Sequence, residues 1–115
     1  MAVWQRPQIT QVVFEHIKYL QTIYNIDCFV VYSEMYWEVV IKEYGFKGCY
    51  APNEPLGRKH NIGMQECLNY EWDYLMQCGS DDLINQDILK LFDYTQDVNG
   101  VNYCYAIDVK TCRTA

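Results

Sequence analysis

The segment DCFVVYS, residues 27–33, constrains the fold more than any other part of the chain. It is a short apolar run rich in β-branched and aromatic residues, which predicts a buried strand. The preceding segment, 7–25, repeats apolar residues at spacings of three and four, which predicts an amphipathic helix with Pro7 in its first turn. The following segment, 34–46, predicts a second helix that ends near Gly45. A buried strand between two helices is typical of a layered α/β fold with a mainly parallel sheet.

The alternation of strands and helices continues through the rest of the chain. Further strands are expected at 46–52, 72–79 and 101–109, and further helices at 55–70 and 81–96. The parallel strands are expected to be joined by right-handed crossovers. Because the sequence has no internal repeat and no linker, we expect one domain over residues 1–115. Only MAVW precedes the first helix and the chain stops soon after the last strand, so that domain is expected to be incomplete at both ends.

Charge and cysteine content exclude several classes of protein. The 115 residues carry a net charge of −6, which argues against a general nucleic-acid-binding protein. The sequence predicts no membrane span and no secretory signal, so a cytoplasmic location is expected. No two cysteines are spaced as CxxC, and His16 and His60 stand alone, which argues against a zinc site. We expect reduced, mostly buried thiols, with a disulfide framework as the alternative. The six cysteines are Cys28, Cys49, Cys67, Cys78, Cys104 and Cys112.

Two adjacent aspartates, Asp81 and Asp82, follow the strand expected at 72–79. Neighbouring carboxylates repel one another, so the pair is easier to hold when a cation lies beside it. Carboxylate oxygens suit Mg²⁺ or Mn²⁺, which proteins often hold by one or two carboxylates together with substrate phosphates. The alternative is that Ser80, Asp81 or Asp82 caps the helix expected after them.

A cluster of basic residues, Arg58, Lys59 and His60, lies at the expected start of the helix at 55–70. Cations are mildly unfavourable there, because the helix dipole already places positive charge at its N-terminus. The arrangement is favourable if an anion binds, since free N–H groups and cations then act together. The alternative is an exposed loop with solvated side chains. The stretch matches neither the P-loop nor the dinucleotide-binding glycine pattern.

The residues between 53 and 82 resemble the nucleotide-sugar half of family-2-like glycosyltransferases of the GT-A fold. These enzymes carry an N-x-G-x-x-x-A-R-N-x-G-like stretch, a helix, a strand and then a D-x-D-type motif. Asn53, Gly57, Lys59, Asn61 and Gly63 stand in a similar order here, and GSDD takes the place of the D-x-D motif. VWQRP and PLGRKHN are similar to a subgroup with a W-x-R-P opening and a P-L-G-R-K-x-N loop. The resemblance implies a Rossmann-like three-layer α/β/α fold, truncated, with a mainly parallel sheet.

The resemblance also implies roles for the two ends of this stretch. Asp82 would bind the divalent metal, Mn²⁺ or Mg²⁺, and Asp81 would face the ribose or share the metal. Arg58 and Lys59 would lie near the base or the diphosphate, and Asn61 would shape the loop.

Three further segments matter for the comparison with the family. Trp4 and Arg6 would line the nucleotide pocket. The family's acidic stretch after the second strand, which touches the base, has only a weak counterpart here in Ser33 and Glu34. The acceptor-binding half lies beyond the D-x-D region in such enzymes, and only about thirty residues follow Asp82 here.

Two functions follow from the sequence. The first is a glycosyltransferase, of hexosyltransferase type, that binds a nucleotide-diphosphate sugar with a divalent metal and transfers the sugar to an acceptor. The alternative is a catalytically inactive, truncated GT-A-like module for binding or interaction. In either case an open sheet edge and exposed apolar surface favour self-association, so a homo-oligomer is expected.

Overall fold

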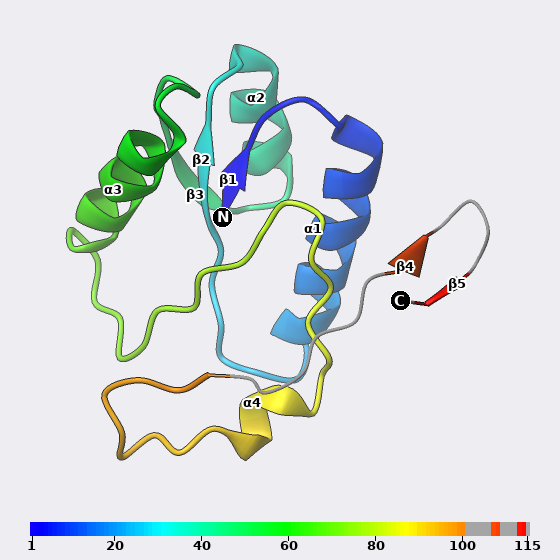
Figure 1. Ribbon diagram of the computed structural model, residues 1–115, viewed down its shortest axis with the longest axis vertical. Helices are drawn as coiled ribbons and strands as arrows, with labels where there is room; N and C mark the ends of the chain where they lie inside the picture. The colour runs from blue at the N-terminus through cyan, green and yellow to red at the C-terminus, as the bar shows by residue number, and fades with distance from the viewer. Residues whose placement is uncertain (101–106, 109–112, 115) are drawn as a thin grey trace. The chain divides into compact units, whose positions relative to one another are not determined.

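The computed structural model describes residues 1–100, 107–108 and 113–114, which form two compact units, 1–84 and 85–115. The first unit is built on a parallel sheet of three strands in the order β1-β2-β3 (Figure 1). Their bounds are β1 Ala2–Val3, β2 Phe29–Tyr32 and β3 Lys47–Tyr50. The central strand pairs Val31 with Ala2 on one side and with Cys49 on the other. The expected α/β class with a parallel sheet is therefore confirmed.

Two helices, α1 (Pro7–Gln21) and α2 (Met35–Glu43), share one hydrophobic core with the sheet. Phe14 of α1 is fully buried and lies edge-on to Trp37 of α2, with ring centroids 5.8 Å apart. Val30 and Tyr32 of β2 belong to the same core, so their side chains define the face of the sheet that α1 and α2 cover. The amphipathic pattern at 7–25 is thus confirmed as a helix, although α1 ends four residues earlier than expected.

The third helix, α3 (Leu56–Cys67), packs on β2 at Val31, the residue between Val30 and Tyr32. A Cβ built on Gly63 would lie 2.2 Å from Cγ2 of Val31, so glycine permits the helix to approach the sheet this closely. Since successive side chains of a strand point to opposite faces, α3 covers the face opposite to α1 and α2 (Figure 1). The chain therefore changes from one face of the sheet to the other after β3.

The segment from 68 to 84 contains no strand, and the strand expected at 72–79 is wrong. Its large apolar side chains Tyr74, Leu75 and Met76 are exposed and are not buried against a helix layer. A strand needs a neighbour to satisfy its backbone N–H and C=O groups, and these residues join no ladder of the sheet. They form an irregular connection that leads from the end of α3 to the turn at 79–82.

Among its described residues, the second unit contains one short helix, α4 (Ile88–Leu91), where a helix over 81–96 was expected. None of its residues is buried, so no packing extends that single turn into a longer helix. The strands β4 (Ile107–Asp108) and β5 (Arg113–Thr114) pair antiparallel. Most of the strand expected at 101–109 lies outside the described residues.

Two sequence expectations concern membranes and cysteines. Across the described ranges, no helix is long and apolar enough to cross a membrane. The four cysteines that the structure describes, at positions 28, 49, 67 and 78, are free thiols, two of them buried and two partly exposed. This agrees with the expectation of reduced thiols for these four, and Cys104 and Cys112 lie outside the described residues.

Candidate functional site

A groove of about 550 Å³ lies at the carboxyl end of β1, between the start of α3 and the turn after the connection. It is lined by β1 and the loop that follows it, by the first residues of α3 and by segment 77–81. The lining residues are Ala2, Val3, Trp4, Gln5, Arg6, Asn53, Leu56, Lys59, His60, Gln77, Cys78, Gly79, Ser80 and Asp81. Four predicted site residues therefore meet in one groove: Trp4, Arg6, Lys59 and Asp81.

The loop between β1 and α1 has an unusual backbone conformation. Gln5 and Arg6 have φ angles of 54° and 47°, in the left-handed region that residues other than glycine seldom adopt. Glu34 holds this loop, because its Oε2 accepts hydrogen bonds from the backbone N of Gln5 at 2.9 Å and from Nε1 of Trp37 at 3.2 Å. Glu34 thereby anchors the loop to α2 and orients Arg6 at the groove.

Lys59 is the buried cation of the groove. It is only 1% exposed, and its Nζ donates to the backbone O of Val3 at 2.5 Å and to Oδ1 of Asn53 at 3.2 Å. Burial lowers the pKa of Lys59, because desolvation disfavours the charged form, and the nearby carboxylate of Glu34 partly opposes this. An ammonium has three N–H groups. Two of them have acceptors among the described residues, and Lys59 belongs to the groove lining.

Two helix N-termini reach the groove. Arg6 is the N-cap of α1 and Leu56 is the first residue of α3, and both residues line the groove. Neither helix has an acidic residue in its first turn or a side-chain hydrogen bond at its cap. Their free N–H groups and dipoles therefore add positive potential to that of Lys59, which favours an anionic ligand.

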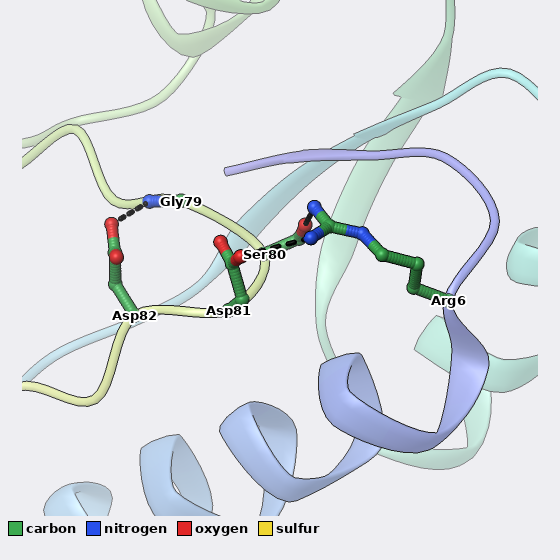
Figure 2. A network of polar contacts seen from close by, with 5 residues as sticks. All are labelled: Arg6, Gly79, Ser80, Asp81 and Asp82. Carbon is green, nitrogen blue, oxygen red and sulfur yellow. Dashed lines mark hydrogen bonds and ion pairs between the residues drawn. The ribbon is translucent and has the colours of Figure 1, made fainter. Parts of the chain in front are cut away.

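The Gly79–Asp82 turn forms the opposite wall (Figure 2). The guanidinium of Arg6 donates from Nη1 to Oδ2 of Asp81 at 2.9 Å and from Nη2 to Oγ of Ser80 at 3.3 Å. Asp82 turns back on the chain, where its Oδ2 accepts from the N of Gly79 at 2.8 Å. Capping is therefore not the role of these residues, because α4 begins only at Ile88.

Both carboxylates lie close to Gly79. A Cβ built on Gly79 would lie 2.6 Å from Oδ2 of Asp82 and 3.3 Å from Oδ1 of Asp81, so a side chain there would occupy the space between the two acids. The glycine of GSDD thus permits both carboxylates to lie close to the backbone of the turn.

The donor atoms of this turn allow a test of the implied metal. Within the part of the chain that the structure describes, no group of three or more His, Cys, Asp or Glu side chains could hold a metal ion. Two neighbouring carboxylates nevertheless fit Mg²⁺ or Mn²⁺, which keep several waters and take their remaining ligands from phosphate oxygens. Asp81 and Asp82 would hold the cation, and a ligand in the groove would have to supply further oxygens.

The structure places the other predicted residues outside the groove lining. Oγ of Ser33 donates to the backbone O of Ala51 at 2.7 Å, which fastens the end of β2 to the end of β3. Arg58 and Asn61 are exposed on α3, since the expected basic loop is part of that helix. Asp82 borders the lining through its bond to Gly79.

Two lining residues, Gln77 and Cys78, had no signal of a site in the sequence. Gln77 and His60 meet across the groove, with 3.1 Å between Nε2 of Gln77 and Nδ1 of His60. Cys78 is also part of the wall, and burial raises the pKa of its thiol to about 11. Their position depends on the path of segment 72–79, which local residue preferences did not predict.

Comparison with known proteins identifies no relative: no protein family, no curated protein and no solved structure matches the chain.

Proposed function

We propose that the groove binds a nucleotide-diphosphate sugar together with a divalent cation, and that the protein transfers the sugar to an acceptor. One observation carries this proposal: the buried ammonium of Lys59 and two uncapped helix N-termini face a carboxylate wall across a single groove. A diphosphate needs concentrated positive potential, and a metal-bridged diphosphate needs carboxylates on its other side. Both are present in the groove.

The topology supports a Rossmann-like, GT-A-type assignment of the fold. Open α/β sheets bind ligands beyond the carboxyl ends of their strands, where the chain changes from one face of the sheet to the other. Here α1 and α2 cover one face, α3 covers the other, and the groove lies at the carboxyl end of β1. A full three-layer arrangement of this type would place the nucleotide at that point.

The chemistry of transfer requires charge stabilisation at the departing diphosphate. A bound Mn²⁺ or Mg²⁺ would supply that stabilisation as a Lewis acid. Lys59 and the N-terminus of α3 would hold the phosphate oxygens in a preorganised field. Trp4 is 44% exposed at the groove and would offer its ring to the base.

The direct test is binding of UDP and GDP by calorimetry, with and without Mn²⁺. The wild-type chain is expected to bind one of them more tightly with the metal, and Asp82→Ala is expected to lose that increase. Lys59→Met is expected to weaken binding both with and without metal. Asp73→Ala, an exposed acid outside the groove, is the control. Equal, metal-independent binding by the wild type and Asp82→Ala would overturn the proposal.

A second candidate is a module that binds the nucleotide without transferring the sugar. Among the described groove residues, the carboxylate of Asp81 is paired with Arg6 and the imidazole of His60 contacts Gln77. Both groups are engaged in these contacts, which favours binding of the nucleotide without transfer of the sugar. Release of sugar from UDP-glucose or UDP-galactose by the wild type, abolished in Asp82→Ala, would exclude this candidate.

Two smaller proposals concern assembly and location. Exposed apolar side chains on α2, among them Met35, Tyr36 and Val39, support the expected homo-oligomer. A monomer mass in light scattering at high protein concentration would contradict it. The free thiols of the described cysteines support a reducing compartment such as the cytoplasm. Localisation of a tagged chain tests this.

A further inference from the structure

We propose that Arg6 competes with the divalent cation for Asp81, so that the cation and the anionic ligand bind cooperatively. This inference rests on the proposed function, because it concerns the regulation of the same groove. It assigns to Arg6 a task beyond lining the pocket: its guanidinium occupies the carboxylate when the groove is empty of ligand, and leaves it when an anion enters.

Arg6 belongs to the groove lining, and its guanidinium contacts the turn at 79–82. Arg6 lies in the loop that Glu34 holds in the left-handed region, and its fork reaches both Asp81 and Ser80 (Figure 2). Both ends of the ion pair are accessible, since the Arg6 side chain is 58% exposed and that of Asp81 is 46% exposed. The contact can therefore open without unfolding of the core.

The carboxylate of Asp81 cannot bind the guanidinium of Arg6 and a divalent ion equally well at the same time. A guanidinium 2.9 Å from Oδ2 of Asp81 repels a divalent ion at that carboxylate, and the ion has to displace it. When the guanidinium turns to an anion in the groove, that repulsion is replaced by attraction between Arg6 and the anion. Arg6 therefore exchanges one partner for another, and Asp81 becomes available to the metal.

Positive coupling follows from this shared contact. Whichever ligand binds first has to break the Arg6–Asp81 pair, and the second ligand then binds without that cost. The effect is reciprocal for binding free energies, so the metal must strengthen anion binding as much as the anion strengthens metal binding. An exposed pair of this kind gives a coupling of up to about fivefold, or about 1 kcal/mol.

The first test measures Mn²⁺ binding alone, by electron paramagnetic resonance of the free ion. Arg6→Gln removes the charge but keeps a long polar side chain with a similar backbone preference. It is expected to bind Mn²⁺ about fivefold more tightly than the wild type. Lys42→Gln is the matched control, because it removes the same charge and breaks the surface ion pair with Glu38 on α2. That control is expected to leave Mn²⁺ affinity unchanged.

The second test measures UDP binding in the presence of EDTA. Asp81→Asn releases Arg6 and is expected to bind UDP about fivefold more tightly than the wild type. Asp82→Asn removes the same charge one residue away, where the partner is the N of Gly79, and is expected to have a clearly smaller effect.

The outcomes separate this inference from the proposed function. Unchanged or weaker Mn²⁺ binding by Arg6→Gln, including no binding by either chain, overturns the role of Arg6. So does an equal gain in UDP affinity for Asp81→Asn and Asp82→Asn. If neither UDP nor GDP binds to the wild type or the variants, the proposed function fails, and the Mn²⁺ measurement still decides whether Arg6 competes for Asp81.

Discussion

Replacement of Gly63 by alanine tests the contact that positions α3, and with it Lys59, against the sheet. The added Cβ would lie 2.2 Å from Cγ2 of Val31, a side chain that is itself buried. Val31 is β-branched and stiff at χ1, so the overlap has to be relieved by a shift of the helix or by an unfavourable rotamer.

The expected magnitude is a difference between two terms. Overpacking of a buried contact costs about 1–3 kcal/mol, and an overlap of this size belongs near about 3 kcal/mol. Alanine recovers about 1 kcal/mol of helix propensity relative to glycine. The net loss in free energy of unfolding is therefore about 2 kcal/mol, which lowers the urea midpoint by about 1 M for an m-value of about 2 kcal/mol/M.

The assay is urea unfolding followed by tryptophan fluorescence and circular dichroism, with two companion variants. Gly57→Ala lies on the same helix with no atom within 4 Å of the added Cβ, so it is expected to be neutral or stabilising by up to about 1 kcal/mol. In a Val31→Ala background, Gly63→Ala is expected to lose its cost, which gives a coupling of about 3 kcal/mol. If Gly63→Ala behaves like Gly57→Ala, α3 does not pack on β2 as described.

Three further predictions concern the groove. Gly79→Ala is expected to displace the carboxylate of Asp82 and to lower stability by up to about 1 kcal/mol in thermal unfolding; no change would contradict the crowding of this turn. Cys78, with a thiol pKa of about 11, is expected to react slowly with iodoacetamide at pH 8 and faster up to pH 11, as followed by mass spectrometry; a plateau near pH 9 would contradict this. Because the pKa of Lys59 is lowered, the folded protein loses that proton before the unfolded chain does. Wild-type stability relative to Lys59→Met is therefore expected to rise with pH from that lowered pKa to 10.5, and a flat difference in urea unfolding would contradict it.

The part of the fold that the sequence predicted correctly is the part in which local pattern and tertiary packing agree. In α1 the apolar stripe is long, and residues on it, such as Val13 and Ile17, are buried. In β2 the run FVVY is apolar on both faces because helices cover both, so its continuous hydrophobicity was informative. Gly45, with a φ of 73°, lies just after α2, as the sequence suggested.

Segment 72–79 shows where local pattern fails. Trp72 and the residues after it have the composition of a strand, but strand preference measures packing against a neighbour more than an intrinsic backbone tendency. The neighbour is absent in the described part of the sheet, and the segment stays irregular, with residues 73–77 exposed. Whether this segment can pair with the edge strand β1 depends on the arrangement of the whole sheet. The residues of the segment alone therefore do not determine whether it forms a strand.

The sequence led us to expect Arg6, Lys59 and Asp81 in one site, and all three line one groove. The expected reason for the position of Asp81, a strand over 72–79 that ends at the carboxyl edge of the sheet, is wrong, because an irregular connection brings Asp81 to Arg6, 75 residues away in the chain. Their individual environments were not predictable. A lysine in a basic cluster is expected to be exposed. The fold instead buries Lys59, whose ammonium donates to the backbone O of Val3 in β1.

Glu34 shows most clearly why position along the chain underdetermines role. The resemblance to glycosyltransferases predicts that Glu34 lies near the nucleotide base, because it follows the second strand. In the structure its carboxylate accepts from Gln5 and Trp37, and so fixes the left-handed loop from which Arg6 reaches Asp81. Glu34 therefore affects the groove indirectly, by holding the backbone of the loop between β1 and α1. It can do so because the left-handed conformation of Gln5 and Arg6 brings this loop beside α2.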